Sequence, residues 1–232
     1  MYQRKFGSYF YEGVMIVASI LVAFTLDASW ANYQESRLEH RILVELRNEM
    51  ASARSRIEAS MAELDSVITS SMELTERLGP DTYPLTPAEA EALFTQILSL
   101  NTLEVPSSVL SSVVATGQLG LISSVQIRKA LAEWPALVAD VAENHTWHRE
   151  ETDAVLIPAI APYVAVRNID YGEPRTTSRS SFDLDPTGLQ RDPTFETLLT
   201  WRLGRQEATY AESATLLQAT TDLIASIDAE LE

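Results

Sequence analysis

Cysteine is absent from the 232-residue chain, which excludes disulfides, thiolate metal sites, iron–sulfur clusters and cysteine nucleophiles. Lysine occurs only at Lys5 and Lys129, so arginine supplies almost all of the 17 basic side chains. These stand against 33 acidic side chains and give a formal net charge of −16. Because nucleic-acid binding requires clustered lysine and arginine, we expect no nucleic-acid partner.

Glycine and proline are both absent from residues 14–78, a composition that favours one very long helix. Residues 13–26 carry no charge, and extension back to residue 8 adds only Glu12. As a helix, residues 8–26 are about 28 Å long, close to the roughly 30 Å hydrocarbon core of a bilayer. Aromatic residues flank this segment on both sides, as interfacial belts do. The sequence therefore predicts a transmembrane helix at residues 8–26.

A cleavable signal peptide is the alternative, with Arg4 and Lys5 in its basic region and a small-residue cleavage site at residues 29–31. The helical pattern continues beyond that site, which favours a membrane anchor. The positive-inside rule then predicts the cytoplasmic (inner) membrane of a bacterium, with a cytoplasmic stub at residues 1–7 and periplasmic residues after about 27.

The predicted topology divides the charge unequally. Arg4, Lys5 and Glu12 sum to +1, which leaves −17 for the exported part of the chain. Any partner recruited electrostatically by the exported part is therefore expected to present a basic surface.

Five residues are candidate contacts with the lipid bilayer or with other membrane protein subunits: Glu12, Gly13, Ser19, Ala23 and Trp30. Glu12 lies one turn inside the span, where it either extends to the headgroups or bonds a neighbouring helix. Ser19 and Ala23 form a small-xxx-small pair that allows close helix packing.

We predict an all-α fold in which the transmembrane helix continues into a long amphipathic helix over residues 27–79. This helix is expected to pack in an exported helical bundle and to end at the Gly79-Pro80 pair. Apolar residues recur three and four positions apart along it as far as Ile68, and Leu78 follows near its end: Leu38, Ile42, Leu46, Met50, Ala53, Ile57, Met61, Leu64, Ile68 and Leu78.

Residues 80–157 are expected to add shorter helices to the bundle. Thr86 begins a capping box with proline at the first helical position. A second helix is expected over residues 107–116, and a third begins at the potential cap Ser123. Pro135 predicts a break or kink in the third helix.

The stretch from Pro158 to Pro193 holds five of the ten prolines, which predicts one long irregular loop over residues 158–192. Its apolar residues are expected to anchor it by docking: Tyr163, Val164, Val166, Ile169, Tyr171 and Phe182.

Residues 193–232 are expected to form the last bundle helix, capped by Asp192. Leu203, Tyr210, Leu217, Ile224 and Leu231 recur at intervals of seven. The companion positions Gln206, Ser213 and Thr220 are polar, which argues against an isolated coiled coil and for packing within a bundle.

Several motifs together resemble a family of single-span bacterial membrane proteins known mainly as a domain of unknown function. They are Tyr11-Glu12-Gly13 before the apolar span, residues 27–30 after it, and the charged segment of residues 38–49. Residues 116–131 are similar to the central G-x-L-x-L-I…L-R-x-x-L segment of that family, and residues 192–195 to its last helix start. The chain departs from the family at Ala31-Asn32, where Asn-Glu is typical. The resemblance implies a membrane anchor with an exported helical domain and implies no chemistry.

Catalytic motifs are scarce in the sequence. It contains no G-x-S-x-G elbow, P-loop or G-x-G-x-x-G, so we expect no enzymatic activity and no cofactor. His145, His148 and Glu151 follow one another three residues apart on a predicted helix and are weak candidates for metal ligands. A solvated or core-edge histidine pair is the ordinary interpretation, and we predict no metal site. His40 is expected at the surface.

Three functional hypotheses follow from these patterns. The first is a non-catalytic, membrane-anchored accessory or scaffold subunit of a larger membrane protein complex, of the kind found around respiratory or photosynthetic complexes. The second is a periplasmic sensor or ligand-binding helical bundle, which the short cytoplasmic stub disfavours. The third is a metal-dependent enzyme at His145 and His148.

Overall fold

The computed structural model describes residues 3–99, 102–169 and 178–232, with side chains described from residue 14 onward. These residues are mostly helical and contain no strand, so the predicted all-α class is confirmed for them. Their elements are α1 (Gln3–Glu76), α2 (Pro87–Ile97), α3 (Ser108–Ala115), η1 (Gln118–Leu121), α4 (Val125–Glu151), η2 (Thr152–Leu156), α5 (Ile157–Ile160), η3 (Val166–Asn168), α6 (Thr187–Gln190) and α7 (Pro193–Leu231).

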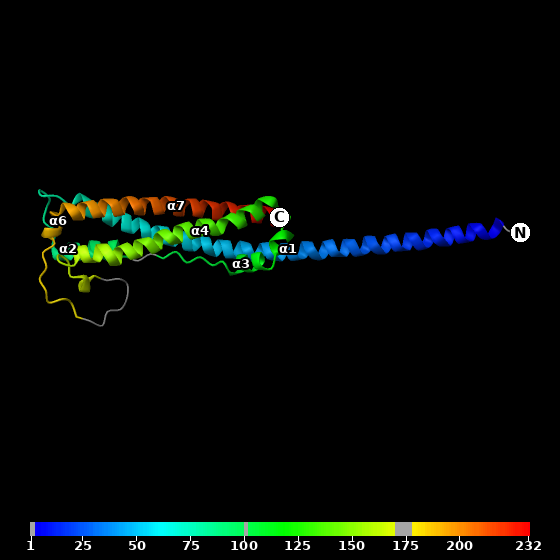
Figure 1. Ribbon diagram of the computed structural model, residues 1–232, viewed down its shortest axis with the longest axis horizontal. Coiled ribbons are helices and arrows are strands. Elements are labelled where there is room, and N and C mark those ends of the chain that lie inside the picture. Colours follow the sequence, from blue (N-terminus) through cyan, green and yellow to red (C-terminus); the bar gives the residue numbers. More distant parts are fainter. Residues whose placement is uncertain (1–2, 100–101, 170–177) are drawn as a thin grey trace.

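The long helices α1, α4 and α7 lie side by side and form an elongated helical body (Figure 1). Helix α7 packs against both α1 and α4, and α2 packs against the far part of α1. Helices α1 and α4 run in the same direction, and α7 returns antiparallel to them. We call the end of the body that holds α3 and the C-terminus the near end, because the rest of α1 projects from it. The far end holds α2 and α6.

Helix α1 has two different parts. Between residues 14 and 37 every side chain is exposed, and the buried face begins only in the body. There the predicted apolar face is confirmed, since Ile42, Leu46, Met50, Ala53, Ile57, Met61 and Leu64 are all buried. The helix ends at Glu76, three residues before the expected stop, and Gly79 then turns the chain with a φ of +123°.

Local capping signals account for most helix starts. Thr86 forms the complete capping box, and the side chain of Asp192 accepts a hydrogen bond from the amide of Thr194. The predicted cap of α4 is wrong by one residue, because Ser124 accepts the hydrogen bond from the amide of Ile127. Ser123 instead donates its amide and hydroxyl to Glu39 of α1, at 2.5 and 2.7 Å.

The chain around Pro135 differs from the expected break. Helix α4 continues from Val125 to Glu151 with Pro135 inside it. Trp134, directly before the proline, is buried and donates its indole N–H to Thr220 of α7 at 2.9 Å. Packing of α4 on α7 thus keeps the segment helical where local preference alone would interrupt it.

The predicted irregular loop at residues 158–192 contains more helix than expected. The chain continues from α4 through η2 and α5 to Ile160 before it becomes irregular, and η3 and α6 follow. Val164 and Ile169 are buried, so they anchor the segment as predicted. Phe182 is 78% exposed and does not dock, and Tyr171 lies outside the described residues.

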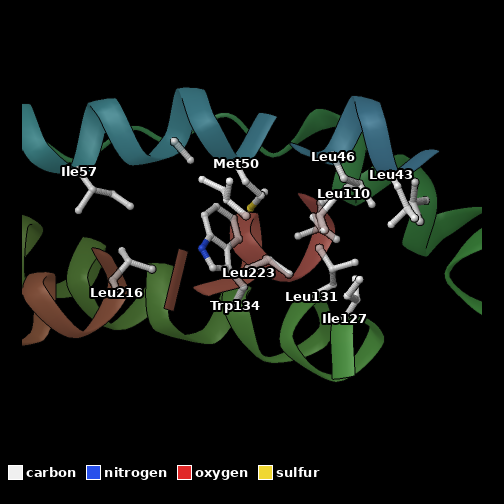
Figure 2. Packing of buried hydrophobic residues seen from close by; sticks show 14 of the residues in the cluster. Leu43, Leu46, Met50, Ile57, Leu110, Ile127, Leu131, Trp134, Leu216 and Leu223 are labelled. Carbon is white, nitrogen blue, oxygen red and sulfur yellow. The ribbon is translucent and has the colours of Figure 1, made fainter. Parts of the chain in front are cut away.

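The body contains two separate apolar cores. The near-end core joins α1, α3, α4 and α7, and Figure 2 shows Trp134 directed toward Met50 within it. The far-end core is built from the ends of α1 and α7, from α2, and from the segment after α4. The rings of Phe94 and Phe195 pack there at a tilt of 60°, with centroids 6.3 Å apart.

Candidate functional site

A layer of polar side chains lies on the long helices between the two cores. We call it the polar layer; it consists of Ser71, His145, His148, Glu151, Thr152, Arg202, Gln206 and Thr209. All of these are buried except His148, which is half-buried. Along α4 and α7 these positions follow the last residue of one core and precede the first residue of the other. The layer therefore lies between the two cores, where Leu64 and Val67 of α1 line the same small cavity.

Helix α7 reaches this layer with a face that is shifted from the one the heptad pattern predicted. Of the five apolar heptad positions Ile224 is buried, whereas the others are only half-buried: Leu203, Tyr210, Leu217 and Leu231. The polar companion positions belong to the main buried row, which runs through Arg202, Gln206, Thr209, Ser213, Leu216, Thr220, Leu223 and Ile227. These positions alternate steps of four and three, so the row is itself a heptad with a polar first half. The sequence did contain a signal for this buried face, because the same spacing continues from the polar positions to the apolar residues Leu216, Leu223 and Ile227.

Hydroxyl groups can occupy this row because they donate hydrogen bonds to backbone carbonyls of α7 itself. Ser213 donates to the carbonyl of Thr209, and Thr220 donates to the carbonyl of Leu216, at 2.8 and 2.7 Å. Burial of a hydrogen-bonded hydroxyl avoids most of the desolvation penalty that an unsatisfied one would carry.

An ion pair between Arg202 and Glu151 lies at the centre of the layer. Their side chains are 3% and 5% exposed, and the guanidinium contacts the carboxylate directly. Arg202 also donates to the carbonyl of Ile97 at 3.5 Å. Burial lowers the pKa of Arg202 to about 10, which still leaves the side chain charged at neutral pH. Each charge therefore depends on the other for compensation in this water-poor interior.

The π-helical segment η2 begins at the residue after Glu151. Glu151 and Thr152 are both buried there, at the level of Arg202. Leu156 and Ile160, which follow along the chain, belong to the far-end core.

His148 is neutral in this environment. Its Nε2 lies 3.0 Å from Thr209 Oγ1, and the Thr209 hydroxyl donates its own proton to the carbonyl of Arg205. This arrangement favours the tautomer in which Nε2 carries the proton and Nδ1 keeps its lone pair. Burial is the main cause that lowers the pKa of His148 to about 4, and the charges of Arg202 and Arg205 and the neighbouring His145 lower it further.

The structure places the three weak metal candidates in one layer but does not assemble them as ligands. Glu151 contacts Arg202, and His148 bonds Thr209. Within the described part of the chain no group of three or more histidine, aspartate or glutamate side chains could hold a metal ion. The adjoining cavity has a volume of only about 20 Å³, which is room for about one water molecule.

The second candidate region is the projecting part of α1. One helix near the N-terminus is long and apolar enough to cross a membrane, and none of its most apolar window is buried. Ser19 bonds the carbonyl of Ile16 at 2.8 Å, so its hydroxyl is satisfied within the helix. Trp30 is 61% exposed, with its ring centroid 6.1 Å from that of Tyr33. Ala23 is exposed, and the side chains of Glu12 and Gly13 lie outside the described residues.

His40 is exposed, as predicted.

Of the tryptophans, Trp134 belongs to the near-end core, and Trp147 contacts Trp201 edge-on, with ring centroids 5.1 Å apart. Arg205 covers the ring of Trp147, with its guanidinium carbon 4.7 Å from the ring centroid. Together they form the outer edge of the polar layer.

Comparison with known proteins returned no matching family model, no matching curated protein and no matching solved structure. The resemblance to a single-span membrane protein family therefore stays a prediction.

Proposed function

We propose that this protein is a non-catalytic accessory or scaffold subunit, anchored in a membrane by α1 and bound to a larger membrane protein complex. The observation that supports this proposal is the continuity of α1. Its apolar, fully exposed part runs without a break into the helix that forms the wall of the body.

A continuous helix fixes the body at a defined height above a bilayer. Twelve residues separate Leu26 from Leu38, where partial burial begins, so the near end stands about 18 Å above the hydrocarbon boundary at a rise of 1.5 Å per residue. Residue 76 then lies about 75 Å above that boundary. Such a rod is suited to contact partners at several heights outside the membrane.

The topology belongs to the same proposal. With Arg4 and Lys5 before the span, residues 1–7 lie in the cytoplasm of a bacterium and the helical body lies in the periplasm. The partners are other membrane subunits and the lipid bilayer, and complexes of the respiratory or photosynthetic type are the first to examine.

Two measurements test this function on the full chain in its native membrane. Alkaline carbonate extraction should leave the protein in the membrane pellet, and mild solubilisation should release it in a particle much larger than a monomer. A protein that is extracted by carbonate, or that is monomeric in every detergent down to the mildest, contradicts the proposal.

A second candidate function is a sensor or ligand-binding bundle, which the polar layer favours. An ion pair, a neutral histidine and a π-helical turn at one level offer a place where the packing of the body can change. A thermal-shift screen of small polar ligands tests it, because a ligand that binds the folded state raises the melting temperature. No shift with any compound argues against a sensor.

A further inference from the structure

The outer face of α1 near the membrane carries a stripe whose charge is opposite to that of the chain as a whole. We call it the basic stripe; it consists of Trp30, Tyr33, Arg37, His40, Arg41 and Val44. All six side chains are exposed. The guanidinium carbon of Arg37 lies 5.9 Å from the ring centroid of Tyr33.

Helical geometry places most nearby carboxylates of α1 away from the stripe. At about 100° per residue, the six positions fall within about 60° on either side of Arg37. Asp27, Glu35 and Glu39 point at least about 80° away from that direction, and Glu45 borders the stripe one turn beyond Arg41. No ion pair joins Arg37 or Arg41 to a carboxylate among the residues that the structure describes.

The stripe is also unused by the body. The buried positions Ile42, Leu46 and Ala53 lie on the opposite side of α1 from Arg37. A shallow open hollow of about 500 Å³ follows the stripe from Tyr33 to Val44. Tryptophan, tyrosine and arginine are the residue types that supply most binding energy at protein interfaces.

We infer that the basic stripe is the docking surface for an acidic, membrane-proximal segment of a partner membrane protein. This inference rests on the proposed function and names where and how the partner binds. The net charge of −16 predicts a basic partner, but the charge within a contact surface decides complementarity, and here that charge is positive.

Height above the membrane favours a protein over a lipid for the cationic part of the stripe, although Trp30, about 6 Å beyond Leu26, still lies at the level of the headgroups. Arg37 is eleven residues beyond Leu26, or about 16 Å along the helix, whereas the headgroup region is only about 5–8 Å thick. A second copy of this chain is disfavoured as well. Two parallel copies joined through this face would place Arg37 and Arg41 against the same cations of the other chain.

The test uses site-specific photo-crosslinking of the full chain in its native membrane. A photoreactive benzoylphenylalanine replaces Ser36, which borders the stripe, and in a control replaces Ser226 at the near end of α7. The expected product at Ser36 joins α1 to a membrane protein through a peptide rich in aspartate and glutamate, and the Ser226 control does not form it.

Charge variants show whether the stripe itself binds. Arg37→Gln with Arg41→Gln should reduce the Ser36 product at least about fivefold. Arg56→Gln with Lys129→Gln removes the same charge elsewhere on the exposed surface and should leave the product unchanged. Equal loss in the two double variants overturns the inference.

Other outcomes at Ser36 also overturn it: adducts with lipid alone, a product that contains only this chain, a partner peptide without acidic excess, or no product. If the large particle persists after mild solubilisation while the Ser36 product is missing, only the docking surface is wrong. If the particle is also missing, the proposed function fails with it.

Discussion

Arg202 shows how much a single buried residue can determine in this protein. Its charge is compensated by Glu151, on a different helix, inside an interior that is otherwise sealed by two apolar cores. Buried ion pairs often add little net stability compared with apolar residues of similar size, but removal of one partner alone is costly. We therefore interpret the pair as a feature that fixes how α4 and α7 align.

Arg202→Met should lower the free energy of unfolding by about 3–5 kcal/mol, because it leaves the Glu151 carboxylate buried without a counter-charge. The double variant Arg202→Met with Glu151→Leu should recover most of that loss. Urea denaturation of the full chain in detergent, followed by circular dichroism, measures both. A double variant as unstable as the single one would show that the pair itself stabilises the fold.

His148 should make stability depend on pH. Its pKa is about 4 in the folded protein and about 6.5 in the unfolded chain, so the unfolded chain binds more protons between these values. The contribution of neutral His148 is complete above pH 6.5 and is lost as the pH falls toward 4.

This loss can be measured as the shift of the urea midpoint between pH 7 and pH 4.5. His148→Gln should reduce the shift, while His40→Gln at the exposed surface should leave it unchanged. Identical shifts in the unchanged protein and in both variants would exclude His148 as the cause.

At the scale of elements, α1 organises the shorter segments through its carboxylates. Glu49 is 7% exposed and accepts hydrogen bonds from the amides of Val109 and Leu110 at 2.7 and 2.9 Å. It thereby caps α3, whose own Ser107 makes no capping hydrogen bond. Glu39 binds Ser123 in the same manner just before α4.

Glu49→Gln should destabilise the near end by about 1–3 kcal/mol, since it removes a charged acceptor from a helix N-terminus. Glu58→Gln is the matched control, because Glu58 is exposed and pairs with Arg54 across one helical turn. Thermal unfolding of both variants tests the difference. Equal melting temperatures would contradict the capping role.

Two glycines in helices should respond to alanine in opposite directions. A Cβ at Gly188 of α6 would lie 2.6 Å from Tyr163 Cε1, whereas a Cβ at Gly204 of α7 meets nothing within 4 Å. Gly188→Ala should therefore destabilise the far end by about 1–3 kcal/mol through overpacking. Gly204→Ala should stabilise α7 by about 0.5–1 kcal/mol through helix propensity. Destabilisation by both substitutions would refute this contrast.

The whole molecule is a long rod with its apolar, exposed segment at one end and a strongly acidic body at the other. If α1 crosses the membrane as proposed, the two ends lie on opposite sides of the bilayer. The absence of cysteine makes this easy to test, because any introduced thiol is unique.

Single-cysteine variants Gln3→Cys, in the proposed cytoplasmic stub, and Ser226→Cys should react differently with a membrane-impermeant maleimide applied to intact spheroplasts. We expect labelling at position 226 and none at position 3 until the membrane is permeabilised. Labelling at position 3 alone would reverse the orientation, and labelling at both positions before permeabilisation would contradict a spanning helix.

The sequence by itself determined the features that depend on local chemistry. The absence of glycine and proline allowed the long α1, and the three- and four-residue spacing from Ile42 to Leu64 set its buried face. Thr86 and Asp192 capped the N-termini of α2 and α7. These signals act within a few residues along one chain segment. They therefore operate the same way whatever packs nearby.

Only the tertiary structure decided which polar residues are buried and which basic residues are left exposed. Arg202 and Glu151 are 51 positions apart, and nothing local indicates that they meet. Helix packing around Trp134 likewise kept α4 intact at Pro135. Whether a side chain is buried depends on which other elements pack against that side of its helix. A periodic pattern shows which side of a helix is apolar. The element that covers this side is determined by contacts between residues distant in sequence.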